Sequence, residues 1–244
     1  MCTVTWFPTP SGYQLFCNRD ESPQRKTAQP PDRTIEDGMP VLMPRDGEHG
    51  GSWIAVNQAG LSLTLLNNYR YDRHDRAVAV GERISRGVLL EQMSSSRSIE
   101  ELRGRIRSRA MDSFEPWIIL ALVPNEPAAI FSWDGNAVSE AKEGALRLLT
   151  SSSWKFDRVA AYREKWFRQM TSGGRSVDPE AYLDFHRQRE VGFERESVCV
   201  VGESVQTVSL TRIMVSGAMR RMDYCPGRPD QHTFLEALSM NEHG

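Results

Sequence analysis

The sequence contains few cysteines, no long apolar run and almost no excess of either charge. Four cysteines among 244 residues are too few for a disulfide scaffold, so we expect free thiols in a reducing compartment. No stretch reaches the roughly 18–20 apolar residues that a membrane-spanning helix needs. The net charge of −2 argues against binding to nucleic acid through bulk electrostatics. These absences predict a cytoplasmic protein with no membrane span. They leave its oligomeric state open.

Motifs for metals and nucleotides are missing as well. The five histidines are scattered without the spacing of metal ligands. The sequence also has no Walker motif and no Gly-x-Gly-x-x-Gly motif. We therefore predict no metal site and no cofactor. The N-terminus lacks a basic segment followed by an apolar one, so we expect no secretory signal.

What the sequence does contain is a series of hairpin signals. Two short apolar segments, 3–7 and 13–16, flank a turn rich in proline and glycine. Two more, 52–57 and 61–66, flank a turn that ends at Gly60. Further strands are predicted at 117–123, 128–133, 145–149, 197–201, 207–215 and 219–224, and helices at 85–93, from Ser98, at 157–170 and from Asp178.

The order of these elements indicates the fold class. Blocks of strands alternate with blocks of helices, which argues against a doubly wound parallel sheet. Hairpins favour antiparallel sheets, and two helical blocks suit two stacked sheets with helices outside. We therefore predict an α+β protein with a single domain over residues 1–244. The polar, proline-rich segment 21–46 is expected to be a surface loop, and the chain from about residue 226 to be a short C-terminal tail.

Cys2 is the first candidate for chemistry because of its position. Removal of Met1, which is usual when the second residue is small, would place a thiol and a free α-amine on Cys2. An α-amine has a pKa of about 7.7–8.0, so near neutral pH it can take the thiol proton, and the thiolate can attack a carbonyl. The alternative is that Cys2 is a small buried apolar residue at the start of a strand, as free cysteines commonly are.

Two polar segments are further candidates. The run 18–21, which reads Asn-Arg-Asp-Glu, ends the second predicted strand and lies beside Cys2 if the hairpin forms. Asp20 would then hold the ammonium group of Cys2, and Asn18 or Arg19 would orient a substrate. After the second hairpin, Asn67 offers an amide N–H to an oxyanion. The alternative is that residues 18–21 are a solvated, charged strand end and that Asn67 is an ordinary polar residue at the end of a hairpin.

Taken together, these residues resemble a known family. The first three residues, the tetrapeptide 18–21, the segment 51–57 with Gly60, and the segment 66–69 occur in the order typical of the NRDE family. This family is named for the tetrapeptide and includes the transport and Golgi organisation protein 2 homologues. It is related to the N-terminal nucleophile hydrolases of the bile-salt hydrolase and penicillin V acylase type. The resemblance implies a four-layer αββα sandwich of two antiparallel sheets flanked by helices, which agrees with the element order.

The resemblance also implies roles for single residues. Cys2 matches the nucleophile, Asp20 matches the aspartate that binds its α-amine, and Asn67 matches an asparagine of the oxyanion hole. The hydrolases carry an arginine just before the asparagine of the tetrapeptide, and here that residue is Cys17.

A second departure lies further along the chain. The hydrolases have a second oxyanion asparagine after a threonine, where this chain has Ser151, whose hydroxyl can still donate a hydrogen bond. A late arginine of the hydrolases aligns loosely with Arg195. Ser151 and Arg195 are therefore candidates for substrate binding.

The leading functional prediction is a hydrolase that uses Cys2 on a linear amide bond of a small molecule. The alternative implied by the resemblance is a non-enzymatic protein that binds or transports haem or another small ligand, with Cys2 as a thiolate ligand. A third interpretation is an inactive relative that serves as an interaction module, which the departures at Cys17 and Ser151 favour.

Overall fold

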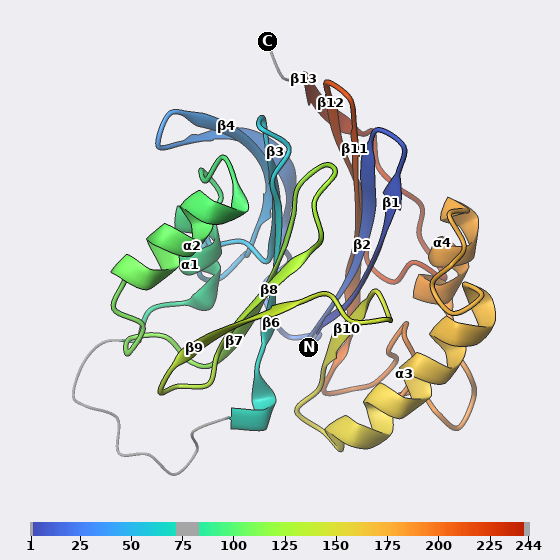
Figure 1. Ribbon diagram of the computed structural model, residues 1–244. Helices are drawn as coiled ribbons and strands as arrows, with labels where there is room; N and C mark the ends of the chain where they lie inside the picture. Colours follow the sequence, from blue (N-terminus) through green and yellow to red (C-terminus); the bar gives the residue numbers. More distant parts are fainter. Residues whose placement is uncertain (1, 72–82, 242–244) are drawn as a thin grey trace.

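A computed structural model describes residues 2–71 and 83–241. Two antiparallel β-sheets lie face to face, and helices cover the outer face of each sheet (Figure 1). The predicted α+β class and the four-layer αββα arrangement are therefore confirmed. None of the helices in the described residues has the length and apolar character needed to cross a membrane.

The first sheet contains strands from both ends of the chain. Its six strands are Leu148–Ser151 (β10), Cys2–Thr9 (β1), Gly12–Glu21 (β2), Gln206–Ser216 (β11), Met219–Pro226 (β12) and Leu238–Asn241 (β13), in this spatial order. The predicted first hairpin is thus confirmed as β1 and β2. Cys2 pairs with Arg19 on β2 and with Ser151 on β10. Strands on both sides therefore fix the backbone of Cys2.

The second sheet follows the order of the sequence. Its seven strands are Gln29–Glu36 (β3), Met39–Arg45 (β4), Ile54–Asn57 (β5), Ser62–Asn67 (β6), Trp117–Leu122 (β7), Ala129–Trp133 (β8) and Val138–Lys142 (β9). The second predicted hairpin is β5 and β6. Every connection in this sheet joins neighbouring antiparallel strands, as the many hairpin signals indicated.

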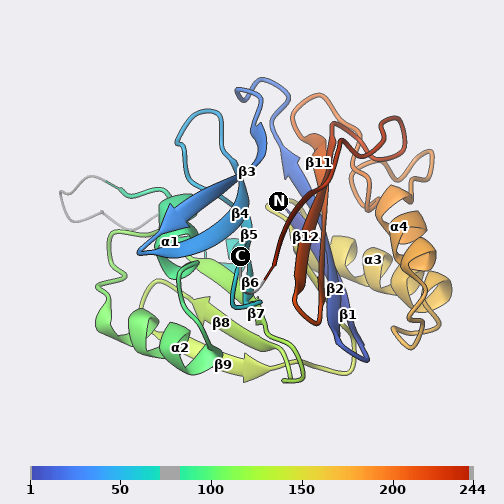
Figure 2. The same ribbon diagram turned by 90° about the horizontal axis from the view of Figure 1, so that it is seen from above.

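Helices form the two outer layers, and Figure 2 shows them on opposite sides of the paired sheets. Helices α1 (Arg86–Met93) and α2 (Ile99–Ser108) cover the second sheet, and α3 (Phe156–Met170) and α4 (Pro179–Arg187) cover the first. The predicted caps form: the Ser98 hydroxyl accepts the N–H of Glu101 at 3.1 Å, which holds the start of α2. Asp178 caps α4 in the same way, followed by proline at the first helical position.

Three apolar layers hold these parts together. One lies between the second sheet and α1 and α2, one between the two sheets, and one between the first sheet and α3 and α4. Leu102, Val4 and Phe167 are fully buried examples, one from each layer. Burying such a side chain contributes roughly 1.5–3 kcal/mol. Cys2 belongs to the layer between the sheets, so its side chain points inward from the first sheet.

The prediction of a surface loop at 21–46 is wrong, because this segment forms β3 and β4. The prolines at 30 and 31 favoured a loop, but β3 is the outermost strand of its sheet, where proline is tolerated. The pairing of β3 with β4 is irregular between Gln29 and Asp32, around these prolines. In β4, Val41 and Met43 are buried under the helices that cover this sheet, and Leu42 is buried between the two sheets.

Two smaller expectations near the C-terminus also differ from the structure. The chain after 226 is not only a tail, because β13 pairs with β12 and extends the first sheet. Residues 197–200 are buried, but the segment 197–201 is not a strand; Arg163 binds the carbonyl of Ser197, and Asn18 binds that of Val198. Side chains therefore satisfy backbone groups that a strand ladder would otherwise pair.

Candidate functional site

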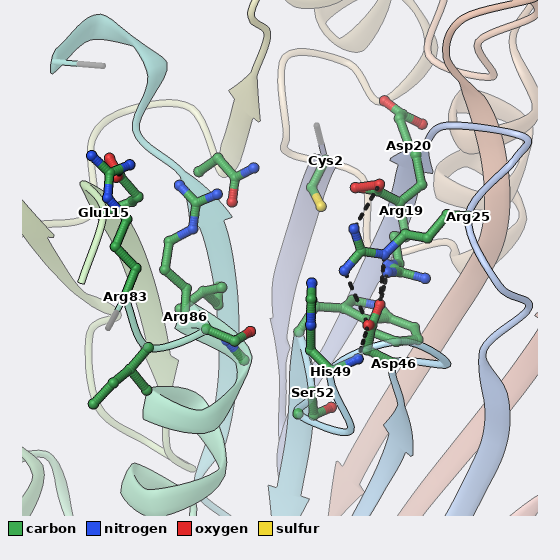
Figure 3. Close-up of a pocket in the computed structure, with 18 residues that line it drawn as sticks. Cys2, Arg19, Asp20, Arg25, Asp46, His49, Ser52, Arg83, Arg86 and Glu115 are labelled. Carbon is green, nitrogen blue, oxygen red and sulfur yellow. Dashed lines mark hydrogen bonds and ion pairs between the residues drawn. The ribbon is translucent and has the colours of Figure 1, made fainter. Parts of the chain in front are cut away.

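Cys2 lines a cavity of about 360 Å³ at one end of the sandwich. The lining comes from the ends of β1 and β2, the segment before β5, the end of β6 and the start of α1. In Figure 3, Cys2 lies between two walls, with Arg19, Asp46 and His49 on one side and Arg83, Arg86 and Glu115 on the other. The cavity therefore has a thiol at its centre and charged groups on both sides.

The Cys2 side chain is 7% exposed, and its surroundings favour the thiolate. The thiol of Cys17, its neighbour on β2, hydrogen-bonds to it and lowers the pKa of Cys2, against the opposite effect of burial. The same contact and burial raise the pKa of Cys17. The backbone N–H of Cys2 donates to the hydroxyl of Ser151 at 3.1 Å. Met1 lies outside the described residues.

Asp20 lines the same cavity and takes part in a fully buried ion pair. Its Oδ2 lies 3.7 Å from Nη2 of Arg163 on α3, and its Oδ1 accepts the hydroxyl of Thr207 at 2.7 Å. Burial raises the pKa of Asp20, while Arg163 and Thr207 act to lower it. The carboxylate is thus held from the helix side of the sheet, at the end of the strand that pairs with Cys2.

Arg163 holds several segments around the site. Its Nη1 donates to the hydroxyls of Thr3 at 2.5 Å and Thr150 at 2.8 Å. Its Nε and Nη2 donate to the carbonyls of Glu196 at 3.1 Å and Ser197 at 3.0 Å. The guanidinium therefore ties β1, β10 and the 196–197 segment to the residues beside Cys2 and Ser151.

Arg19 is part of the first wall. Its guanidinium lies 4.2 Å from the ring centroid of Trp53 and forms an ion pair with Asp46. Arg25 binds both oxygens of Asp46, at 2.9 and 3.0 Å. Burial alone would raise the pKa of Asp46, but the hydrogen bonds from Arg25 and from the N–H of His49 hold it well below its usual range. This wall is consequently a rigid, charged surface.

The second wall is built from the start of α1 and the chain before β7. Arg83 forms an ion pair with Glu115, and Arg86 donates to the carbonyl of Pro116 at 3.1 Å. The wall approaches the loop before β5 closely: a Cβ on Gly51 would lie 2.4 Å from the carbonyl carbon of Gly87. Because it has no side chain, Gly51 permits this close approach of two backbone segments.

Asn67 and Ser151 connect the Cys2 cavity to a second one of about 410 Å³. Asn67 lines both cavities, and Ser151 lines the second. The amide of Asn67 donates to the hydroxyl of Tyr69 at 2.7 Å. The apolar side chains of the second cavity come from β7, β8, β10, α3 and the segment just before β10; they are Ile118, Ile130, Leu146, Leu148, Leu149, Phe156 and Ala160.

Two of the sequence candidates lie elsewhere. Asn18 points to the helix side of the first sheet, where its amide donates to the carbonyls of His186 at 2.8 Å and Val198 at 3.0 Å. It is fully buried and does not line the Cys2 cavity. Arg195 lies over the ring of Trp154 at 5.5 Å and lines a separate surface cavity. The structure thus brings Cys2, Arg19 and Asp20 together with Asn67, and leaves Asn18 and Arg195 outside the cavity.

Sequence reasoning missed Arg163 and Asp46. The buried residues of the predicted helix α3 are Val159, Arg163 and Phe167. These three are spaced four residues apart, so an arginine in the centre of an i, i+4, i+8 series was a detectable signal. Asp46 had no comparable signal, because its partners, Arg19 and Arg25, come from β2 and from the turn after that strand. Within 2–71 and 83–241, no group of three or more potential ligand side chains is placed to hold a metal ion.

Comparison with known proteins places this geometry in a family and a fold. The profile of the family described as Transport and Golgi organisation 2 matches residues 1–216. No match was found among curated proteins.

Solved structures with a similar fold include an acylase, a bile acid hydrolase and an acid amidase. Penicillin V acylase from Agrobacterium tumefaciens is 11% identical with a TM-score of 0.53, over 99% of this chain and 86% of that one. The C2A mutant of conjugated bile acid hydrolase from Clostridium perfringens is 12% identical, with a TM-score of 0.54 and coverage of 99% and 98%. The N-acylethanolamine-hydrolyzing acid amidase orthologue from Caenorhabditis elegans is 13% identical, with a TM-score of 0.59 and coverage of 89% and 93%. At these identities the likeness establishes the N-terminal nucleophile hydrolase fold.

Proposed function

This chain belongs to the Transport and Golgi organisation 2 family and has the fold of N-terminal nucleophile hydrolases, and from that premise we propose that it hydrolyses an amide bond with Cys2 as the nucleophile. The observation that carries the proposal is the position of Cys2 in the cavity, between its strand partners and beside Asp20.

The proposed reaction uses the thiol and the α-amine of the same residue. Removal of Met1 frees the amine, which takes the thiol proton. The thiolate attacks the carbonyl carbon of the amide, and the ammonium returns a proton to the departing nitrogen as the C–N bond breaks. The amine then takes a proton from water, which attacks the thioester, releases the acid and restores the thiol.

The surroundings of Cys2 support the first of these steps. The hydrogen bond from Cys17 lowers the pKa of the Cys2 thiol, which favours the reactive thiolate. Asp20 supplies a carboxylate beside the chain end, kept in place by Arg163 and Thr207. We assign Asp20 the role of orienting the amine.

The carbonyl oxygen of the substrate needs donors as negative charge develops on it. The amide N–H of Asn67 and the hydroxyl of Ser151 lie at the boundary between the two cavities, and we assign them this role. Both groups already have partners, Tyr69 for Asn67 and the backbone N–H of Cys2 for Ser151. The Asn67 amide has a second N–H that can donate to the substrate while the first stays on Tyr69, and the Ser151 hydroxyl hydrogen can be donated while its oxygen still accepts from Cys2.

The two cavities differ in character, and this suggests how a substrate lies. The Cys2 cavity is lined by four arginines and four carboxylates, and it suits the polar amine part. The second cavity has an apolar lining and suits an apolar acyl part. In this arrangement the scissile bond lies where Cys2, Asn67 and Ser151 meet.

A haem group does not fit the residues around Cys2. The apolar face of a porphyrin would displace water from the charged groups that line this cavity. The free energy of this desolvation is unfavourable, and the existing ion pairs do not offset it. The proposed reaction therefore contains no step through haem. A haem titration that gives a spectral shift in the wild type and none in Cys2→Ala would contradict this conclusion.

The proposal is tested with a panel of amides that vary in the acyl part. N-acetylglycine and N-octanoylglycine are incubated with wild type, Cys2→Ala and Cys225→Ala, and the released amine is measured. We expect hydrolysis by the wild type and by Cys225→Ala, a buried thiol on the other face of the same sheet. In Cys2→Ala the rate should fall on the order of 10³-fold or more, as for loss of other nucleophiles. Unchanged hydrolysis by Cys2→Ala would refute the proposal.

A further inference from the structure

Cys17 is a buried nucleophile that the proposed reaction does not consume. In the β1–β2 pairing, Cys2 lies opposite Arg19 and Val4 lies opposite Cys17. Cys2 and Cys17 are therefore diagonal neighbours on adjacent strands. Both side chains belong to the apolar layer between the two sheets, so they lie on the same face.

The two thiols differ in their access to solvent molecules. Cys2 lines the cavity of about 360 Å³, whereas Cys17 does not line it and is 0% exposed. A small oxidant that enters the cavity thus meets Cys2 first. The hydrogen bond between the thiols also makes Cys2 the more reactive of the two, because it lowers the pKa of Cys2 and raises that of Cys17.

We propose that Cys2 and Cys17 form a peroxide-sensitive dithiol in which oxidation of Cys2 leads to a reversible Cys2–Cys17 disulfide. The disulfide removes the nucleophile of the proposed hydrolase, so its effect on activity rests on the proposed function, whereas the thiol chemistry does not. It also protects Cys2 from the irreversible oxidation that an isolated thiolate undergoes.

The chemistry balances with hydrogen peroxide as the oxidant. The Cys2 thiolate attacks one peroxide oxygen, the O–O bond breaks, and hydroxide leaves and takes up a proton, which gives Cys2 sulfenic acid and water. The sulfur of Cys17 then attacks the sulfur of Cys2, the S–O bond breaks, and hydroxide leaves with the Cys17 proton as a second water. Two thiols have lost two hydrogen atoms, and one peroxide has become two waters.

The geometry requires a small movement. Diagonal neighbours on antiparallel strands lie roughly 7–8 Å apart at Cα, and a disulfide spans about 4.4–6.8 Å. A shift of about 1 Å at one partner closes the gap. Cys2 is the first residue of β1, so the shift disturbs only the end of the strand ladder.

Both cysteines fall in one tryptic fragment, because Arg19 is the first lysine or arginine in the sequence. The purified protein is treated with a small excess of hydrogen peroxide, unfolded in guanidinium chloride so that the buried Cys17 is accessible, and blocked with iodoacetamide. It is then digested, and the fragments are weighed. For the wild type we expect the fragment ending at Arg19 to lose two hydrogen atoms and to resist alkylation. Dithiothreitol should restore two alkylatable thiols.

Matched variants separate the outcomes. In Cys17→Ser, and in Cys17→Ala as a second variant, the fragment should gain two or three oxygen atoms that dithiothreitol does not remove. Cys225→Ser, which changes a buried thiol on the other face of the sheet, should behave as the wild type. A wild-type fragment that gains oxygen while Cys17 stays alkylatable would overturn the proposal. Because the readout is a mass, it is independent of amide hydrolysis, and failure of either proposal is recognised separately.

Discussion

Asp20 and Arg163 form the fully buried ion pair next to the proposed nucleophile, and breaking it should be costly. Both side chains have no exposed area, and their charged atoms lie 3.7 Å apart. Asp20→Asn keeps the size of the side chain but leaves the guanidinium of Arg163 without its carboxylate. Loss of one partner of a buried pair costs about 3–5 kcal/mol. Since Arg163 keeps its hydrogen bonds to two hydroxyls and two carbonyls, we expect about 3 kcal/mol, at the lower end.

The assay is thermal unfolding followed by circular dichroism. For a chain of this size, about 3 kcal/mol corresponds to a decrease in melting temperature of roughly 6–12 °C. Glu164→Gln is the control, because its pair with Arg168 is on the surface of the same helix and contributes at most about 0.5 kcal/mol.

A double-mutant cycle isolates the pair itself. Arg163→Met alone leaves Asp20 buried without a cation, and burial already raises the pKa of Asp20, so the carboxyl takes up a proton. We expect the double variant to cost about 1–3 kcal/mol less than the sum of the single variants. Additive effects, or an Asp20→Asn variant within about 1 kcal/mol of the wild type, would refute the reasoning.

Two further predictions concern the supports of the site. Burial holds the pKa of His186 at about 3, with the charge of Arg163 adding to the effect. Because the unfolded chain binds this proton near pH 6.5, stability should fall by about 2 kcal/mol from pH 7 to pH 5 in the wild type. This fall in stability should be absent in His186→Gln. If the unfolding midpoints of the wild type and the variant depended equally on pH, the low pKa of His186 would be contradicted. Gly51→Ala should cost about 1–3 kcal/mol in chemical denaturation, because the new Cβ meets the backbone of Gly87. Gly104→Ala, in α2 with open space around it, should instead stabilise by about 0.5–1 kcal/mol; equal effects of the two alanines would contradict the close-approach argument.

Elements encoded by local signals were predictable from the sequence. The β1–β2 hairpin, the cap of α2 at Ser98 and the start of α4 at Asp178 all form as predicted. Each depends on residues within a few positions of one another, such as a turn between apolar segments or a capping side chain and its backbone donor.

Elements that depend on tertiary position were not predictable. The prolines in β3 are compatible with a strand only because β3 lies at a sheet edge, and the sequence does not reveal which strand is outermost. β13 is short and forms because β12 offers it an edge. The candidate site likewise combines residues that the sequence indicated with residues that only the tertiary structure brings in. The family order brought out Cys2 and Asp20, whereas the partner of Asp20, Arg163, comes from a helix that only the folded chain brings near.

The central claim is that Cys2 is a reactive N-terminal thiol, and its most direct test is a mass measurement with timed alkylation. We expect the intact protein to lack Met1, and iodoacetamide near neutral pH to modify Cys2 well before Cys199 and Cys225. Burial raises the pKa of those two thiols to about 12 and about 11, whereas the pKa of Cys2 is lowered. Retention of Met1, or alkylation of Cys2 no faster than that of Cys225, would contradict the account.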